Sequence, residues 1–387
     1  MEYKFSELAK LNYGKSKKKV ESLSGNYPIM GTGGLIGYAT EYLYDNPSVL
    51  IGRKGSIQNI YYLEQPFWTI DTLFYTEINT QLVTPKFFYY KLKTIDFMLY
   101  DEGTSIPSLR TQTINDITLN IPSIVEQKVI TSILNLFDQK IEVNNKIIDN
   151  LEEQAQAIFK SWFVDFEPFQ DDEFIDSELG LIPEGWEVKK LGDLSKKIIT
   201  GKTPSTKNKD YYGDYLPFIK IPDMHGNVYV VDVETRLSKD GMLSQKNKIL
   251  PTNTICVSCI ATVGLVSLVS TESQTNQQIN SVIPKEKVSY CYLYCALTDK
   301  YKYLNAIGSS GSTTKNVNKR TFGNLKIIYP GEKPMEKFHN ICSPFFDIIK
   351  KLQFQNKKLE QIRDSLLPKL MSGEIDVSEL NIDTKGR

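Results

Sequence analysis

The sequence predicts an α+β protein with two β-rich domains, each followed by a long α-helix. Three observations indicate this fold: an internal repeat, two long stretches with the apolar spacing of amphipathic helices, and short strand-like runs before each stretch. The chain has 387 residues, so two or three domains of about 100–200 residues are expected. Its 41% of hydrophobic and 24% of charged residues are ordinary values for a globular protein with buried cores.

The first domain is expected to span residues 1–123. Three runs rich in β-branched and aromatic residues, at 26–40, 48–62 and 66–78, are interrupted by Gly, Pro, Asn or Asp. This pattern predicts short strands joined by turns. A short helix is predicted after them, at 84–99.

The first long helix is assigned to residues 124–166. Between 125 and 163 the apolar residues recur at steps of three, four and seven, which is the spacing of one helix face. Such a helix would be roughly 57 Å long at about 1.5 Å rise per residue. A helix lying on its own domain is the alternative, but globular helices average about 11–12 residues, so a coiled coil is favoured. The residues expected at the helix–helix and partner interface are Phe137, Ile141, Ile148, Leu151, Phe159 and Trp162.

The second half of the chain repeats this order after a linker. Residues 167–185 are acidic, aromatic and rich in Pro and Gly, and they are therefore expected to be a linker rather than a site. A second domain is expected at 186–332, a second long helix at 333–374 and a tail at 375–387. Apolar spacing typical of a helix runs from 335 to 372. The expected interface residues on this helix are Phe345, Leu352, Leu359, Ile362 and Leu366.

The repeat can be aligned directly. Residues 103–122, GTSIPSLRTQTINDITLNIP, match residues 311–330, GSTTKNVNKRTFGNLKIIYP, without a gap. Both segments run from a loop rich in small polar residues to an alternating strand closed by proline. The beginnings of the two domains also match, because 3–15 resembles 188–202 with small length differences. The unit of the repeat is thus a globular domain followed by a long helix.

The formal net charge of zero is unevenly distributed along the chain. Residues 1–122 carry 12 basic and 12 acidic side chains, whereas 123–185 carry 4 and 14. Residues 186–330 carry 20 and 11, and 331–387 carry 10 and 9. The basic third segment is suited to phosphate, and the acidic second segment would repel it.

Cysteine and histidine give little support to a metal site. Two cysteine pairs, Cys256 with Cys259 and Cys291 with Cys295, resemble zinc-ligand spacing. The first pair lies in an apolar run that predicts a buried strand, where residues three apart point to opposite faces. Buried thiols are therefore favoured over zinc, and no metal site is assigned. The two histidines of the chain also disfavour histidine-rich metal sites and most histidine-dependent catalysis.

Motifs for catalysis are incomplete. Gly201-Lys202-Thr203 resembles the end of a phosphate-binding loop, but Lys196 stands where that pattern requires glycine. The chain contains no adjacent prolines, so the Asn-Pro-Pro-aromatic or Asp-Pro-Pro-aromatic loop of adenine methyltransferases is missing. No catalytic residue is assigned.

Basic residues recur at matching places in the two halves and predict contacts to DNA. Lysines and polar loops supply phosphate contacts, whereas Arg, Asn, Gln and Thr read base edges. For each residue alone, a solvated surface charge is the alternative. The candidates are Lys15, Lys17, Lys18, Lys19, Arg53, Lys54 and Arg110 in the first half, and Lys202, Lys207, Lys220, Lys315, Lys319 and Arg320 in the second.

Several strings resemble the conserved regions of type I restriction-modification specificity subunits. They are WFVDF at 162–166, LGLIPEGWEVKKLGDL at 179–194, LLPKL at 366–370 and SGEI at 372–375. The resemblance implies two target-recognition domains and two helices packed as an antiparallel coiled coil with pseudo-twofold symmetry. It implies that each domain reads one half of a bipartite double-stranded DNA target.

The same resemblance implies that catalysis resides in partner subunits. Two modification subunits would supply S-adenosylmethionine and adenine methylation, and restriction/translocase subunits would use ATP and Mg²⁺ for translocation and cleavage. The chain itself would be non-catalytic and hold no cofactor. Its location is expected to be cytoplasmic, because it has neither a run of eighteen apolar residues nor the apolar centre of a signal peptide.

Two alternatives of other classes remain. One is a self-contained restriction or modification enzyme, which the missing methyltransferase motif disfavours. The other is a coiled-coil adaptor without DNA binding, which the basic second domain disfavours.

Overall fold

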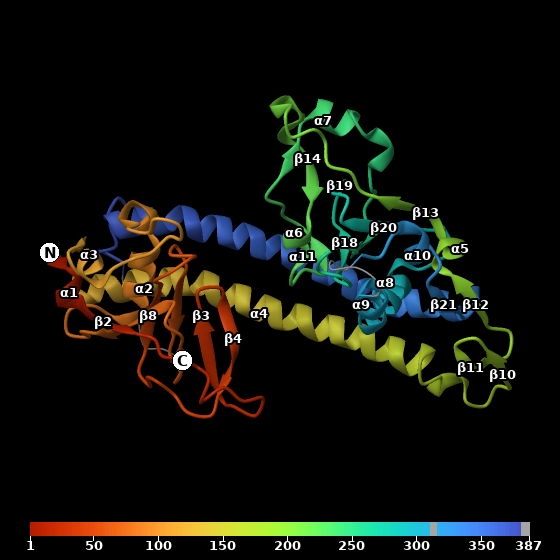
Figure 1. Ribbon diagram of the computed structural model, residues 1–387, viewed down its shortest axis with the longest axis horizontal. Coiled ribbons are helices and arrows are strands. Elements are labelled where there is room, and N and C mark those ends of the chain that lie inside the picture. Colours follow the sequence, from red (N-terminus) through yellow and green to blue (C-terminus); the bar gives the residue numbers. More distant parts are fainter. Residues whose placement is uncertain (310–315, 381–387) are drawn as a thin grey trace. The chain divides into compact units, whose positions relative to one another are not determined.

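The computed structural model, drawn in Figure 1, describes residues 1–309 and 316–380. The chain divides into two compact units: unit 1 contains Met1–Gln139 and the segment from Glu360 onward, and unit 2 contains Lys140–Leu359. Each unit includes parts of both long helices, because α4 (Ile124–Phe163) starts in unit 1 and α11 (Glu332–Ser372) starts in unit 2. Each unit therefore builds its own hydrophobic core from one β-rich domain and segments of two helices.

The domain of unit 1 is formed by short strands and helices. In chain order they are β1 (Glu2–Lys4), α1 (Phe5–Leu8), β2 (Ala9–Tyr13), β3 (Tyr27–Gly31), β4 (Gly34–Ala39), β5 (Ser48–Gly52), β6 (Ile60–Leu63), β7 (Trp68–Thr69), β8 (Leu73–Ile78), α2 (Pro85–Lys93), η1 (Phe97–Tyr100), α3 (Thr111–Asn115) and β9 (Thr118–Asn120). One sheet has the order β2-β8-β5-β6 and another β4-β3-β7, with β3 and β7 parallel, while β1 pairs with β9.

The domain of unit 2 has a longer series of elements. They are β12 (Glu187–Lys190), α5 (Leu191–Leu194), β13 (Ser195–Thr200), η3 (Lys209–Tyr211), β14 (Tyr212–Ile219), α6 (Ile221–Met224), β15 (Tyr229–Val230), β16 (Arg236–Leu237), α7 (Lys239–Leu243), η4 (Lys246–Lys248), β17 (Ile255–Ser258), β18 (Val266–Val269), β19 (Gln274–Thr275), β20 (Ile279–Pro284), α8 (Tyr290–Asp299), α9 (Tyr301–Ser309), α10 (Lys319–Gly323) and β21 (Lys326–Tyr329). The sheets have the orders β13-β20-β17-β18-β15 and β16-β14-β19, and β12 pairs with β21.

The two domains share one strand connectivity, which confirms the internal repeat. The orders β2-β8-β5-β6 and β4-β3-β7 of unit 1 correspond to β13-β20-β17-β18 and β16-β14-β19 of unit 2, and both three-stranded sheets contain a parallel pair. The first helix is anchored identically in each domain. Phe5 donates its backbone N–H to the Ile117 carbonyl, and Leu191 donates to Leu325, each at 2.8 Å.

The long helices expected at 125–163 and 335–372 are present as α4 and α11, and they pack antiparallel. In unit 2, Phe159 of α4 packs against Phe338 with ring centroids 6.2 Å apart. Asn144, which is nearer the start of α4 than Phe159, donates to the side chain of Asn356, which is nearer the end of α11 than Phe338, at 2.7 Å. The two helices therefore run in opposite directions. The fold class is confirmed: α+β domains followed by helices that form an antiparallel coiled coil.

Local sequence explains the ends of α4. Ser123 and Glu126 form a reciprocal capping box before the first turn: the Ser123 N–H donates to Glu126 Oε2 at 2.9 Å, and the Glu126 N–H donates to Ser123 Oγ at 3.3 Å. The helix stops at Phe163, and Phe166 adopts a left-handed φ of 56° before Pro168.

Two buried glutamines fasten the long helices to the domains. In unit 1, Gln127 of α4 accepts the Thr84 backbone N–H at 2.8 Å and donates to the Leu82 carbonyl at 2.9 Å. In unit 2, Gln353 of α11 accepts the Tyr229 backbone N–H at 2.8 Å. Because both amides satisfy buried main-chain groups, each domain is held to its helix by polar bonds as well as by apolar packing.

The segment expected to be a linker contains ordered elements in unit 2. After η2 (Glu167–Phe169), β10 (Phe174–Ser177) and β11 (Gly180–Pro183) form an antiparallel hairpin. Ile182 and Trp186 are buried in the core of unit 2, and this burial anchors a stretch whose acidic side chains are exposed. Composition alone could not reveal this, because only a few side chains of the segment carry the packing.

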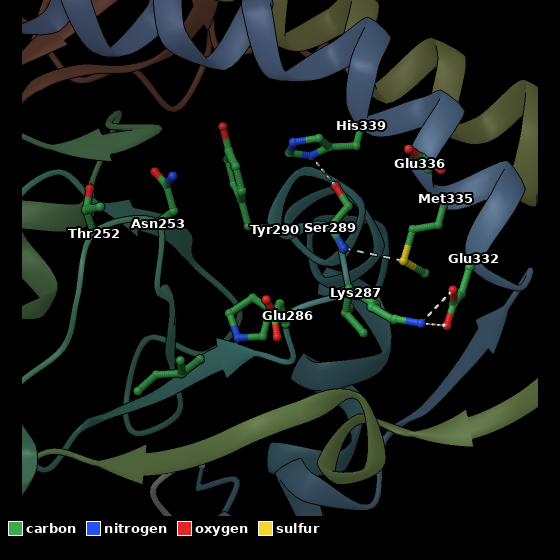
Figure 2. Close-up of a pocket in the computed structure, with 13 residues that line it drawn as sticks. Thr252, Asn253, Glu286, Lys287, Ser289, Tyr290, Glu332, Met335, Glu336 and His339 are labelled. Carbon is green, nitrogen blue, oxygen red and sulfur yellow. Dashed lines mark hydrogen bonds and ion pairs between the residues drawn. The ribbon is translucent and has the colours of Figure 1, made fainter.

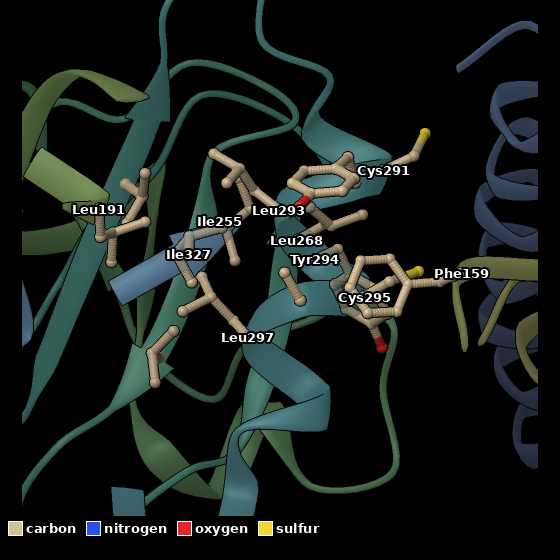
Figure 3. Close-up of a cluster of buried hydrophobic side chains, with 14 of the residues drawn as sticks. Phe159, Leu191, Ile255, Leu268, Cys291, Leu293, Tyr294, Cys295, Leu297 and Ile327 are labelled. Carbon is tan, nitrogen blue, oxygen red and sulfur yellow. The ribbon is translucent and has the colours of Figure 1, made fainter. Parts of the chain in front are cut away.

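All five cysteines are buried, as the preference for buried thiols predicts. Cys256 and Cys259 on and beside β17 belong to different hydrophobic clusters, which agrees with opposite faces of a strand. Burial raises the pKa of Cys256 to about 12 and that of Cys259 to about 11. Figure 3 shows Cys291 and Cys295 of α8 among the apolar side chains of the main cluster of unit 2.

Candidate nucleic-acid interface

The first strands of the large sheets, β2 and β13, end at equivalent glycine–lysine pairs. The Lys15 backbone N–H donates to the Thr69 carbonyl at 2.8 Å, and the Lys202 N–H donates to the Thr275 carbonyl at 2.9 Å. The preceding Gly14 and Gly201 pass so close to neighbouring carbonyls that an added Cβ would lie 2.0 and 2.1 Å from an oxygen. Both lysines thus emerge from a fixed backbone at the same point of the two domains.

In unit 1, an arginine extends the surface beside Lys15. Arg53 follows β5, and its Nη1 donates to the Asp71 carbonyl at 2.7 Å. Its guanidinium carbon lies 5.0 Å from the centroid of the Tyr13 ring, which gives a cation–π contact at the end of β2. Lys15 and Arg53 thus follow the carboxyl ends of β2 and β5, which lie at the same end of the four-stranded sheet.

The loop before α3 contributes the rest of this surface. Lys54 forms a β-bridge with Ser108, and the Leu109 N–H donates to the Arg53 carbonyl at 2.9 Å. Asp101 accepts the backbone N–H groups of Ser108 and Gly103, which lowers the pKa of its carboxyl and keeps the loop closed. The exposed Arg110 is paired with Glu102 through Nε at 3.1 Å. We define Lys15, Arg53, Lys54 and Arg110 as the unit 1 basic surface.

The corresponding surface of unit 2 is rich in lysine. Lys248 donates to the Thr200 carbonyl at 2.8 Å, next to Lys202 at the end of β13. The pKa of Lys248 is lowered, first by burial and then by repulsion from Lys319, Lys197 and Lys202. We define Lys197, Lys202, Lys248 and Lys319 as the unit 2 basic surface. Mutual repulsion of this kind favours an anion between the ammonium groups.

Hydrogen bonds connect the elements that carry the unit 2 basic surface. Thr200 Oγ1 donates to Asn280 Oδ1 at 2.6 Å, and Asn280 Nδ2 donates to the Val317 carbonyl at 3.1 Å, just before α10. Exposed Gln277 accepts from Thr203 Oγ1 at 2.7 Å. Amide and hydroxyl groups thus lie beside the lysines, and this combination suits DNA, where cations contact phosphates and amides contact base edges.

The other predicted DNA-contact residues that the structure describes lie outside these two surfaces. Lys17 is paired with Glu21 at 2.5 Å, and Lys220 lies 3.8 Å from Glu234. Lys315 falls outside the described residues. Four further candidates are exposed side chains without a role in either basic surface: Lys18, Lys19, Lys207 and Arg320.

The predicted helix residues differ in burial. Ile148 and Phe159 are buried in the core of unit 2, and Leu366 packs against the core of unit 1. Ile362 is 36% exposed. The remaining residues are half-buried, with Leu151, Trp162, Phe345 and Leu352 against the core of unit 2, and Phe137, Ile141 and Leu359 outside the hydrophobic clusters.

Comparison with known proteins gives the family. A family model described as "Type I restriction modification DNA specificity domain" matches residues 1–153 and 183–364. The chain belongs to this family. It is 36% identical to the type I restriction enzyme HindI specificity subunit of Haemophilus influenzae, over 77% of this chain and 79% of that protein. It is 29% identical to the MjaIX specificity subunit of Methanocaldococcus jannaschii, over 87% and 80%.

A solved structure supports the fold of this specificity subunit. The type I restriction-modification S subunit from M. genitalium matches with a TM-score of 0.58 and 16% identity, over 96% of this chain and 95% of that one. Family membership makes the protein a type I restriction-modification specificity subunit, a protein of DNA target recognition.

Sequence reasoning missed two lysines of the specificity subunit. Lys197 and Lys248 join Lys202 and Lys319 only through folding, because β13, η4 and α10 are far apart in the chain. Strand alternation does not single out Lys197, because Lys196 and Lys197 are both exposed at the start of β13. No local pattern singles out Lys248.

The specificity subunit also contains a pocket of about 580 Å³ in unit 2, shown in Figure 2. Ser289 Oγ lies 3.0 Å from His339 Nδ1, which invites comparison with a nucleophile and its base. The same oxygen accepts the Tyr292 backbone N–H at 3.3 Å and so caps α8. This serine–histidine contact therefore has a structural explanation at the junction of the domain with α11.

The described residues contain neither a membrane-spanning helix nor a metal-binding cluster of side chains. No described helix is long and apolar enough to cross a membrane. Across residues 1–309 and 316–380, no group of three or more His, Cys, Asp or Glu side chains is arranged to hold a metal ion.

Proposed function

We propose that this chain binds a bipartite double-stranded DNA target, with one half-site contacted by each β-rich domain. The observation that carries the proposal is the repeated basic surface. Lys15 and Lys202 occupy the same position in the shared topology, and further cations gather beside each of them. Two related surfaces in one chain suit two separate half-sites.

We further propose that the chain directs adenine methylation and restriction without catalysing either reaction. The two basic surfaces offer ammonium, guanidinium, amide and hydroxyl groups, which bind DNA but do not form a nucleophile with its base. Modification subunits would supply S-adenosylmethionine chemistry, and restriction/translocase subunits would use ATP and Mg²⁺. The contribution of this chain is the choice of sequence.

Support for partner subunits comes from the long helices. Within unit 2, α4 exposes Val143 and Ile147, and α11 exposes Ile341, Ile348 and Phe354, each 39–48% exposed. Apolar residues repeated along an exposed helix are typical of surfaces that receive another helix. The acidic stretch 123–185, with 4 basic and 14 acidic residues, would keep this region off DNA and available to protein.

The function is tested by methylation sequencing of DNA from a host that expresses the chain with its modification subunit. We expect a split motif with modified adenine in both halves, present only when the chain is present. Chain-independent methylation, or an active methyltransferase without any motif that requires the chain, would favour the adaptor alternative. Cleavage or methyl transfer by the purified chain alone would favour a self-contained enzyme.

The unit 2 basic surface makes a quantitative prediction. We expect Lys202→Gln with Lys319→Gln to weaken DNA binding by the complex with modification subunits at least about tenfold at physiological salt. The slope of log affinity against log salt concentration should fall in magnitude by about 2, because two phosphate contacts are lost. Fluorescence anisotropy over a salt series measures both quantities.

A matched control removes the same charge elsewhere in unit 2. Lys333→Gln with Lys337→Gln changes two exposed lysines of α11 and should leave the salt slope unchanged. Equal losses from the two double variants would show that total charge, rather than the unit 2 basic surface, governs DNA binding.

A further inference from the structure

Arg53 of unit 1 has a main chain that is held by two backbone hydrogen bonds. Its backbone N–H donates to the Thr72 carbonyl at 2.8 Å, and its carbonyl accepts the Leu109 N–H at 2.9 Å. The preceding Gly52 lies in β5 so close to Ser56 that an added Cβ would lie 2.4 Å from the Ser56 carbonyl oxygen. The start of the Arg53 side chain is thus set by the sheet and by the loop before α3.

The plane of its guanidinium is fixed as well. Nη1 donates to the Asp71 carbonyl at 2.7 Å, and the guanidinium carbon lies 5.0 Å from the Tyr13 ring centroid and 6.0 Å from that of Phe74. The two rings support each other edge to face at 5.1 Å, and Phe74 is fully buried. An arginine held in this way loses little further side-chain freedom when it binds a ligand.

One edge of the guanidinium remains available. Among the described residues, the Asp71 carbonyl is its one hydrogen-bond acceptor, so Nε and Nη2 have no described partner. Two parallel N–H donors of an arginine match the O6 and N7 acceptors of guanine in the major groove. By contrast, Arg110 of the same surface already uses its Nε on Glu102.

The described residues of the second domain have a different arrangement at the equivalent positions. The β-register that pairs Tyr13 with Phe74 pairs Thr200 with Asn280 in unit 2, where a short hydrogen bond replaces the two rings. The position equivalent to Arg53 is Cys259, whose carbonyl accepts the Val317 N–H as the Arg53 carbonyl accepts that of Leu109. The two domains therefore present different chemistry at the same place, as they would if their half-sites differ.

We infer that Arg53 reads a guanine in the half-site bound by the first domain and so determines specificity for a G·C pair there. The inference rests on the proposed function and adds to it a residue and a base. Lys54, the next residue, is exposed and has a point charge without the two-donor edge, so its contribution is to phosphate binding.

The test is methylation sequencing in a host that expresses the chain with its modification subunit, with Arg53→Gln, Arg53→Lys and Lys54→Gln compared with the unchanged chain. We expect Arg53→Gln and Arg53→Lys to relax one G·C position of one half-site roughly 5- to 150-fold, which corresponds to about 1–3 kcal/mol at 1.4 kcal/mol per tenfold. The other half-site should keep its letters. Lys54→Gln should lower methylation at all sites without changing the motif.

The outcomes separate this inference from the function on which it rests. A chain-dependent motif that both Arg53 variants leave unchanged, or change at a position other than G·C, would overturn the assignment of Arg53 alone. The absence of any chain-dependent motif would overturn the proposed function itself. If Arg53→Gln abolishes methylation, the Arg53→Lys variant tests the inference instead. An Arg53→Lys chain that is folded by circular dichroism and keeps the original motif contradicts the inference. A relaxed G·C position in that variant supports it.

Discussion

Phe163→Ala is expected to lower the free energy of unfolding by about 3–5 kcal/mol. Phe163 is the last residue of α4 and is 2% exposed in the core of unit 2. Its ring lies 4.9 Å from that of Tyr292 on α8, 5.3 Å from that of Phe338 on α11 and 5.8 Å from that of Trp186 after the hairpin. Removal of the ring therefore leaves a cavity at the point where both helices meet the second domain.

Denaturant unfolding followed by tryptophan fluorescence measures this change, because Trp162 and Trp186 both lie close to Phe163. Phe354→Ala is the matched control, since Phe354 lies on α11 and is 39% exposed. It should change the unfolding free energy by about 0.5 kcal/mol or less. Similar losses for the two variants would contradict the view that the ring cluster around Phe163 holds this part of unit 2 together.

Periodic and repeated features were predictable from the sequence. The alignment of 103–122 with 311–330 is confirmed at one pair of positions: the Leu109 N–H donates to the Arg53 carbonyl, and the N–H of the aligned Val317 donates to the Cys259 carbonyl. The two long helices were predictable for the same reason, since apolar spacing repeats over many turns. Patterns that extend over tens of residues predict an element correctly even when the details of its tertiary packing are unknown.

Features that depend on one fold-specific contact were not predictable. The apolar run 254–270 forms two antiparallel strands, and Ala261 and Gly264 adopt positive φ in the turn between them. Apolar spacing marks helix faces but does not say which face meets the second helix, so it could not show that Ile362 stays 36% exposed while Ile148 and Phe159 are buried. Likewise, the sequence placed Arg53 among several cations and gave no sign that Tyr13 and Asp71 fix it.

The glycine of the Gly201-Lys202-Thr203 motif has a structural role that differs from the nucleotide binding that the motif resembles. Gly201-Lys202-Thr203 resembles part of a nucleotide-binding loop, and that function was set aside because Lys196 replaces a required glycine. The structure gives the glycine another purpose, which is to let the end of β13 pass the carbonyls of Thr275 and Asn276. Gly14 has the same role in unit 1, beside Thr69 and Ile70.

Gly201→Ala should therefore have a large effect, although alanine is the smallest side chain with a Cβ. That atom would lie 2.1 Å from the Asn276 carbonyl oxygen and 2.3 Å from that of Thr275, and main chain cannot rotate away as a flexible side chain can. We expect a loss of about 3 kcal/mol or more in unfolding free energy, because the strand end must move and the bond from Lys202 to Thr275 must lengthen or break.

The displacement of the strand end should also impair DNA binding, because it moves Lys202, which belongs to the unit 2 basic surface. Gly201→Ala should weaken DNA binding by the complex more than tenfold, as measured by fluorescence anisotropy. Gly213→Ala in β14 is the control: its new Cβ would approach no atom closer than 3.4 Å, so stability and affinity should stay within about 0.5 kcal/mol. Gly14→Ala should reproduce the effect in the first domain. If Gly14→Ala or Gly201→Ala behaves like Gly213→Ala, the close approach of neighbouring carbonyls does not explain why glycine is required at these positions.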